Sequence, residues 1–286
     1  MNGSVTDIHI HLQPWSFLKP AARESLERHR TDAALIQSLA ADPGRALDWM
    51  DAAGLDRIGV INYVSPDVMG FPPETNDWAS RFCARDRRRL IGFGSVHPRY
   101  ARDVRAEAAR LIDDLALAAF KIHPPHQGFR ANAYRDELPS LAELYAVASD
   151  RRAPVMIHTG TSIFPGARSR LGDPMDADDV AVDFPDLVLL LAHAGRPLWC
   201  EEAFFVARRH PNVYLDLSGI PPSKLLECLP RLEEIASKCL FGTDWPGPGV
   251  PSVEGNIAAF RALPLSEGAK AKILHGTAEA LFPPGS

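Results

Sequence analysis

Eight short segments rich in apolar residues are spread along the chain, and most of them are followed by a segment whose apolar residues have helical spacing. This alternation predicts parallel strands joined by helices, because parallel strands need a long crossover connection. Eight such units within 286 residues favour a closed (β/α)8 TIM barrel over an open doubly wound sheet. We therefore expect a single α/β domain over residues 1–286. The predicted strands are 5–12, 57–63, 90–96, 118–122, 154–157, 188–192, 213–217 and 239–241, and the predicted helices are 22–30, 46–53, 74–87, 101–115, 138–151, 199–209, 225–229, 253–261, 267–274 and 277–281.

Composition and charge exclude several classes of protein. The net charge of −5 and the lack of a basic block predict no nucleic-acid partner. No GxGxxG follows a predicted strand, so a dinucleotide site has no support. The chain has neither a signal-peptide pattern nor 18 consecutive apolar residues, which predicts a cytoplasmic protein without a membrane segment. Cys83, Cys200, Cys228 and Cys239 lack CxxC spacing, and we expect all four to be reduced core cysteines.

A long segment, 13–44, separates the first predicted strand from the repeating pattern. An insertion at this place in a barrel suits a lid over the mouth, and it equally suits a surface excursion.

Polar residues follow the predicted strands at the point where most of them end. Catalytic groups of such barrels lie at the carboxyl ends of the strands. These positions hold His9, His11, His97, Lys121, His123, His158, His193, Asp216 and Asp244, so six of the ten histidines lie at strand exits. This concentration predicts a functional site at the barrel mouth.

The first strand carries the pattern DIHIH over residues 7–11. Side chains alternate along a strand, so Asp7, His9 and His11 share one face. Two imidazoles on one face can reach a single metal ion, although an HxH pair alone is a weak signal. Asp7 either orients one of these histidines or caps the start of the strand deep in the barrel.

A full ligand set can be assembled from the strand exits. His9, His11 and His158 with Asp244 would offer three nitrogens and one oxygen, a donor set that suits zinc. Such an ion lowers the pKa of a bound water to about 7. Asp244 can serve both as ligand and as proton acceptor, and His193 can position the water or stabilise developing charge.

Several ordered motifs resemble the amidohydrolase superfamily, and in particular its amidohydrolase 2 branch, which contains aminocarboxymuconate-semialdehyde decarboxylase. The motifs are DIHIH at 7–11, FKIHP at 120–124, VMIHTG at 155–160, LAHAG at 191–195, HPNVYLDLSG at 210–219, FGTDWP at 241–246 and ILHGTAEALF at 273–282, where Thr277 replaces a more usual Asn. The resemblance implies a (β/α)8 barrel that binds one divalent metal ion, Zn²⁺ or alternatively Mn²⁺. It also implies ligand roles for His9, His11, His158 and Asp244, and a catalytic role for His193.

Lys121 admits three interpretations. Other members of the superfamily carry a carboxylated lysine at this strand, where it bridges two metal ions, but the branch resembled here normally uses one metal. Lys121 either binds a substrate carboxylate or forms a salt bridge inside the mouth.

The resemblance implies two kinds of reaction. We favour hydrolysis of a lactone, ester or amide bond in a small, carboxylate-bearing substrate, and the alternative is non-oxidative decarboxylation of an aromatic or unsaturated acid. The predicted substrate-binding residues are Lys121, His123, Arg168 and Arg196, because arginine binds carboxylates through two hydrogen bonds. Arg170 is a further candidate anchor, and for each arginine taken alone a solvated surface position is the favoured interpretation. Trp15, Phe17, Phe164 and Trp245 are candidates for an apolar wall.

Three further alternatives stay open. The branch contains closely similar lactonases that need no metal, and a barrel can bind a metabolite without turning it over. Decarboxylases of the branch are often dimers, which makes a homodimer the assembly that the resemblance suggests.

Overall fold

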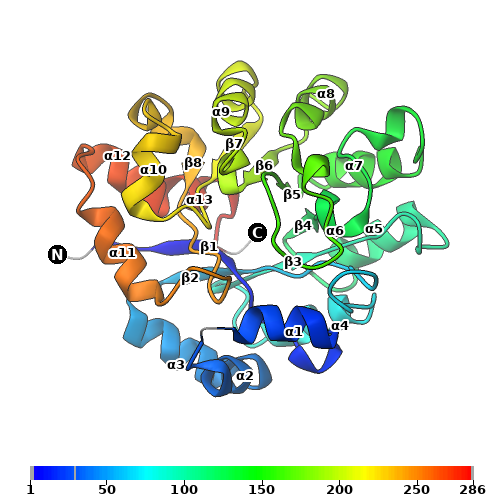
Figure 1. Ribbon diagram of the computed structural model, residues 1–286. Helices are drawn as coiled ribbons and strands as arrows, with labels where there is room; N and C mark the ends of the chain where they lie inside the picture. Colours follow the sequence, from blue (N-terminus) through cyan, green and yellow to red (C-terminus); the bar gives the residue numbers. More distant parts are fainter. Residues whose placement is uncertain (1–2, 29, 285–286) are drawn as a thin grey trace.

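The computed structural model describes residues 3–28 and 30–284 of the chain. Eight parallel strands lie side by side in chain order, and the helices form a ring around them (Figure 1). The strands are β1 (Thr6–Ile10), β2 (Arg57–Val60), β3 (Leu90–Gly94), β4 (Ala119–Ile122), β5 (Val155–His158), β6 (Leu189–Ala192), β7 (Val213–Asp216) and β8 (Cys239–Leu240). The prediction of a single-domain (β/α)8 TIM barrel is confirmed.

Backbone hydrogen bonds between the last and the first strand close the barrel. Ile8 N donates to Phe241 O at 3.0 Å, and Asp244 N donates to His9 O at 2.9 Å. His11 N donates to Trp245 O at 2.8 Å. The chain segments that carry His9, His11 and Asp244 are therefore joined directly through their backbones.

The strands are buried because helices cover their outer side and side chains fill the inside. All four residues of β6 are buried, as expected for the apolar run Leu189–Ala192. Gly59 of β2 allows the backbone of β1 to come close, since a Cβ at this position would lie 2.0 Å from Ile8 O.

The helices agree with the predicted positions to within a few residues at most ends. They are α1 (Pro20–Glu27), α2 (Ala33–Ala41), α3 (Pro43–Ala53), α4 (Thr75–Cys83), α5 (Val104–Asp113), α6 (Pro124–Gln127), α7 (Leu141–Asp150), α8 (Met175–Asp183), α9 (Cys200–Arg209), α10 (Pro222–Cys228), α11 (Val253–Arg261), α12 (Glu267–Ala271) and α13 (Thr277–Leu281). The predicted helices 267–274 and 277–281 form one continuous helical segment, in which a π-helix at Lys272–Gly276 joins α12 to α13. Helices α2, α6 and α8 were not predicted from the sequence.

Local capping explains the bounds of α3. The side chain of Asp42 accepts a hydrogen bond from Gly44 N at 2.8 Å, and Pro43 occupies the first turn. Gly54 ends the helix with φ 73°, a conformation that glycine adopts at little cost.

The segment 13–44 packs against the barrel mouth rather than away from it. Trp15 is buried, and Lys19 N donates to Met69 O at 2.8 Å. Trp15 and Leu26 both line the pocket described below. These contacts fit the interpretation of the segment as a cover over the barrel mouth better than that of a surface excursion.

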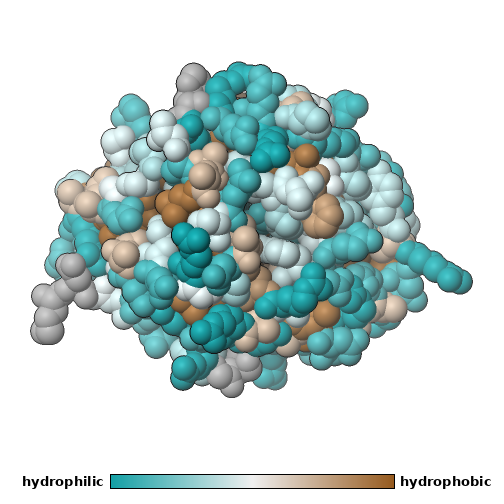
Figure 2. Space-filling view, turned by 90° about the horizontal axis from the view of Figure 1, so that it is seen from below, coloured by the Kyte–Doolittle hydropathy of each residue, from teal (hydrophilic) through white to brown (hydrophobic). Residues whose placement is uncertain are grey.

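The outside of the molecule is mainly polar on the face that Figure 2 shows. Hydrophilic side chains dominate there, and the hydrophobic ones form small, separate patches. Within the described part of the chain, none of the helices has the length and the apolar character needed to cross a membrane. The homodimer and the cytoplasmic location stay predictions.

The cysteine prediction is wrong for one pair. Cys200, at the start of α9, and Cys228, at the end of α10, form a disulfide with their Cα atoms 5.5 Å apart. Their separation of 28 residues carries no motif, and only the packing of neighbouring β/α units brings them together. Cys83 and Cys239 are buried and free, as expected.

We expect the double substitution Cys200→Ser with Cys228→Ser to lower the free energy of unfolding by about 3 kcal/mol, because the disulfide restricts the unfolded chain. Urea denaturation in non-reducing buffer measures this change. Dithiothreitol should lower the stability of the wild type by a similar amount and leave the double variant unaffected. A wild type that does not respond to the reductant would contradict the disulfide.

Candidate metal centre

Three potential ligand atoms converge where β1 and β8 meet. His9 Nε2 lies 3.2 Å from His11 Nε2, and Asp244 Oδ1 lies 3.6 Å from the former and 3.1 Å from the latter. Any two ligand atoms of a tetrahedral site with metal–ligand bonds of 2.0–2.1 Å are about 3.3–3.4 Å apart. The observed separations bracket this value, so the three side chains have the spacing of ligands around one ion.

Hydrogen bonds at the other ring nitrogens fix both histidines. His9 Nδ1 lies 2.5 Å from Asp216 Oδ2, and His11 Nδ1 lies 3.1 Å from Gln13 Oε1. Both partners are oxygens that accept, so the protons reside on Nδ1 and each Nε2 keeps its lone pair for a ligand. Neither role was predicted from the sequence. No spacing rule connects His9 with Asp216, which lies 207 positions away, whereas Gln13 lies only two residues after His11 and was overlooked.

Asp7 binds backbone rather than a histidine ring. Its carboxylate accepts from His9 N at 3.0 Å, from Thr243 N at 3.0 Å and from Thr243 Oγ1 at 2.6 Å. Burial raises the pKa of Asp7 to about 7, although these hydrogen bonds act in the opposite direction. Of the two predicted roles, the structural one deep in the barrel is observed.

Asp244 is held as a carboxylate. Burial raises its pKa, but its contacts with His11 and His9 and the positive charge of Arg196 act in the opposite direction and hold the pKa of Asp244 below its usual value. Arg196 Nη2 lies 3.5 Å from Asp244 Oδ2. The backbone of Asp244 has φ 70°, a costly conformation for a residue other than glycine.

His158, at the end of β5, contributes a buried nitrogen without a partner. Its Nε2 accepts and donates no hydrogen bond within the described chain. Burial keeps the pKa of His158 well below 6.5, so the ring is neutral. Its ring stacks on that of His123, with centroids 3.7 Å apart, and lies edge-on to His193 at 4.6 Å. A neutral imidazole with a free nitrogen suits a fourth ligand, although His158 is not in the group of three whose ligand atoms all lie within 4.8 Å of one another.

His193 follows β6 on a strained turn. His193 and Ala194 have φ values of 67° and 44°. His193 Nδ1 donates to Ser218 O at 3.0 Å, which leaves Nε2 unprotonated in the neutral ring. Burial, followed by the charge of Arg196, keeps the pKa of His193 well below 6.5. The ring can therefore accept a proton at Nε2.

A pocket of about 260 Å³ opens over these residues at the carboxyl ends of the strands. We call it the mouth pocket; its walls include Trp15, Leu26, Tyr63, Phe71, Lys121, His123, His126, His158, Phe164, His193, Arg196 and Asp244. The predicted substrate residues Lys121, His123 and Arg196 thus lie together. Arg168 and Arg170 are exposed and outside this lining.

The apolar wall differs in part from the prediction. Trp15 and Phe164 line the mouth pocket, whereas Phe17 is exposed and Trp245 stacks on Trp49 with ring centroids 4.8 Å apart.

Tyr63, which was missed as a candidate from the sequence, and His126 also line the mouth pocket. His126 Nε2 lies 2.7 Å from Ser162 Oγ, and His126 Nδ1 lies 3.3 Å from Tyr63 OH. No pattern in the chain marked Tyr63, which follows β2 in an apolar run.

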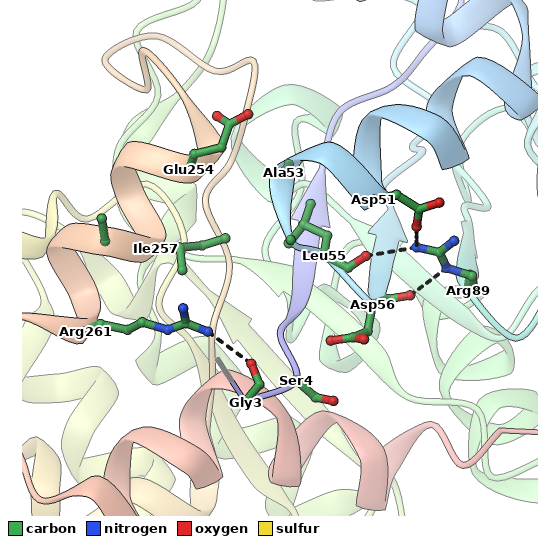
Figure 3. A pocket seen from close by; sticks show the side chains of 12 residues that line it. Gly3, Ser4, Asp51, Ala53, Leu55, Asp56, Arg89, Glu254, Ile257 and Arg261 are labelled. Carbon is green, nitrogen blue, oxygen red and sulfur yellow. Dashed lines mark hydrogen bonds and ion pairs between the residues drawn. The ribbon is translucent and has the colours of Figure 1, made fainter. Parts of the chain in front are cut away.

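A larger hollow of about 680 Å³ lies at the opposite, amino-terminal side of the strands (Figure 3). Its polar side chains are engaged in structural contacts: Arg89 bridges Asp51 and the carbonyl of Asp56, and Arg261 donates to Gly3 O. It contains no histidine, and the chemistry of barrels lies at the other face. The mouth pocket is therefore the candidate site.

A (β/α)8 barrel with a His-His-Asp cluster at its mouth defines a narrow class of enzymes. The chain belongs to the amidohydrolase family, whose amidohydrolase 2 model matches residues 6–283. It is therefore an enzyme, and the resemblance stated from its motifs is confirmed. None of the curated proteins compared with the chain matches its sequence.

Solved structures share the fold over nearly the whole chain. An uncharacterized TIM-barrel protein from Bordetella bronchiseptica is 25% identical, with a TM-score of 0.77 and 98% of each chain covered. A dihydroxybenzoic acid decarboxylase from a Polaromonas species, solved with bound manganese and the inhibitor 2-nitroresorcinol, is 18% identical, with a TM-score of 0.69 over 98% of this chain and 97% of that one. A probable 2-pyrone-4,6-dicarboxylic acid hydrolase from Acinetobacter baumannii, with citric acid bound, is 14% identical, with a TM-score of 0.66 over 98% and 99%.

We expect Asp216→Asn to weaken the affinity for a divalent metal by about 10–100-fold, because a neutral amide replaces the carboxylate that accepts from His9 Nδ1 and is a weaker acceptor. Competition with a chromophoric chelator measures this affinity. Asp178→Asn is the matched control, since Asp178 pairs with His210 at 2.7 Å on the opposite side of the barrel. Equal affinities in the two variants would contradict the role of Asp216.

Proposed function

We propose that the protein is a metal-dependent hydrolase that cleaves a lactone, ester or amide bond in a small, carboxylate-bearing substrate. The observation that carries this proposal is the tetrahedral spacing of His9, His11 and Asp244 at the base of a pocket that also contains His193. A volume of about 260 Å³ suits a small molecule and not a polymer.

The residues present fit one divalent metal ion. We propose His9, His11, His158 and Asp244 as its ligands, because three neutral imidazoles with free nitrogens and one carboxylate are the donor set of zinc. Manganese is the alternative, and it is bound in the Polaromonas decarboxylase. When bound, such an ion acts as a Lewis acid and lowers the pKa of a coordinated water to about 7.

The chain itself supplies the proton transfer. His193 Nε2 accepts a proton from the attacking water, while the bond from Nδ1 to Ser218 O keeps the ring in this tautomer. Asp244, which remains ionised, is a second acceptor in the same place. The pocket walls, with Trp15 and Phe164, exclude bulk water from the reaction.

Substrate binding is assigned to the cationic side of the pocket. Arg196 anchors the substrate carboxylate, and Lys121 and His123 complete the contacts. Arg168, a sequence candidate for the same role, is the weaker proposal because of its exposure.

The alternative function is non-oxidative decarboxylation of an aromatic or unsaturated acid. It uses the same ion and the same anchoring of an acid, and its support comes from decarboxylases among the structural neighbours. Product analysis separates the two reactions, since decarboxylation releases CO₂ and hydrolysis incorporates one oxygen from water.

Metal content tests the proposal first. Protein purified without chelator should contain about one zinc or manganese per chain by elemental mass spectrometry, and His158→Ala should lose it. Two ions per chain would indicate that Lys121 is a carboxylated bridge. Protein that takes up no ion when metal is offered would contradict the mechanism and leave a metal-free lactonase or a binding barrel.

We expect His193→Asn to lower kcat by about 10²–10⁴-fold, because the proton acceptor is removed. The metal content should stay unchanged, which separates loss of the base from loss of the ion. Activity screens with lactones, amides and unsaturated acids provide the substrate for this comparison. An unchanged kcat would exclude His193 as the base.

We expect Arg196→Ala to raise KM for the substrate about tenfold or more, because a charge-assisted contact is lost. Arg168→Ala is its matched control and should leave KM unchanged. If the effects are reversed, the anchor is Arg168.

A further inference from the structure

Lys121 is a buried amine without a partner. It lies on β4 with no exposed surface, and its Nζ makes no hydrogen bond or ion pair within the described chain. Lysine normally places three donors into water or onto acceptors. The side chain also lines the mouth pocket, so its amine is next to the space that a substrate occupies.

Other lysines of the described chain have ordinary surroundings. Lys224 pairs with Glu227, and Lys270 pairs with Glu267. Lys238 donates to backbone carbonyls. Lys121 therefore differs from them in both burial and the lack of an acceptor.

The surroundings of Lys121 increase the neutral, nucleophilic fraction of its amine. An ammonium group that is buried without acceptors is costly. Burial, together with the charge of Arg196, lowers the pKa of Lys121 to about 8, although Asp216 and Asp244 act in the opposite direction. A desolvated lysine beside another cation is the usual setting of an amine that attacks carbonyl groups.

A second unpartnered donor lies in the same pocket. Among the described residues, Arg196 Nε is buried without an acceptor, and the guanidinium contacts Asp244 and the carbonyl of Thr161. An arginine nitrogen that lacks its acceptor suits a carboxylate oxygen of a ligand.

We propose that Lys121 forms an imine with small oxo acids, whose carboxylate binds Arg196 and whose carbonyl carbon bonds to Lys121 Nζ. The amine nitrogen adds to the carbonyl carbon, and both amine hydrogens leave with the carbonyl oxygen as one molecule of water. No oxidant or reductant is needed. This reactivity goes beyond the proposed hydrolysis and does not depend on a metal ion.

Reductive trapping with glyoxylate, the smallest oxo acid, tests the proposal. The full chain is incubated with glyoxylate and sodium cyanoborohydride near pH 7, and peptide mass spectrometry locates the carboxymethyl adduct. The neutral fraction of an amine with a pKa near 8 exceeds that of an ordinary lysine by about 200-fold at this pH. We expect Lys121 to be modified at least tenfold faster than Lys224.

Matched variants and a second probe sharpen the outcome. Lys224→Met should retain the adduct at Lys121, and Lys121→Met should lack rapid labelling. Acetaldehyde has no carboxylate, so Arg196→Gln should slow trapping of glyoxylate much more than trapping of acetaldehyde. Wild-type protein provides the main result without relying on the folding of any variant.

Labelling of Lys224 ahead of Lys121 would overturn the proposal. Equal trapping of glyoxylate and acetaldehyde by the wild type would overturn the assignment to oxo acids. Trapping by chelator-treated protein separates this inference from the proposed function. Imine formation needs no metal ion, so Lys121 should be labelled equally well even if the protein proves not to bind one.

Discussion

The carboxylate of Asp7 joins the first strand to the last, and the site depends on that contact. It accepts from the backbone of His9 on one side and from the backbone and hydroxyl of Thr243 on the other. His9 is itself a candidate ligand and Thr243 precedes Asp244, so the carboxylate of Asp7 and the backbone hydrogen bond from Asp244 N to His9 O together hold the two segments that carry these ligands. The cost of burying Asp7, visible in its raised pKa, is offset by three hydrogen bonds.

Around this contact the barrel mouth holds polar groups that the chain does not satisfy by itself. Within the described chain, five side chains of the mouth pocket have a buried polar atom without a partner: Gln13 Nε2, Lys121 Nζ, His123 Nδ1, His158 Nε2 and Arg196 Nε. Buried polar groups in a folded protein are almost always paired, and each exception costs free energy. The concentration of five exceptions in one pocket, with strained backbone at His193 and Asp244, is typical of a site whose partners arrive with a ligand.

The fold was largely predictable from the sequence, because strands buried on both faces appear as continuous apolar runs. All eight strands lie within or beside the predicted ranges. Helix α2 was missed because its residues, AALIQSLAA, are apolar on most sides, and α8 was missed because its acidic residues mask the spacing of its few apolar ones. The disulfide between Cys200 and Cys228 was missed because it depends on how two neighbouring β/α units pack.

Local patterns in the chain were enough to bring the main histidines to the barrel mouth. Alternation along β1 places His9 and His11 on one face, and the ends of β5 and β6 deliver His158 and His193. The orientation and spacing of these groups depend on contacts between distant parts of the chain. The hydrogen bond from His9 to Asp216 forms because closure of the barrel brings together residues more than 200 positions apart. Arg168 lies outside the mouth pocket because of how its loop packs. Local sequence patterns encode neither of these.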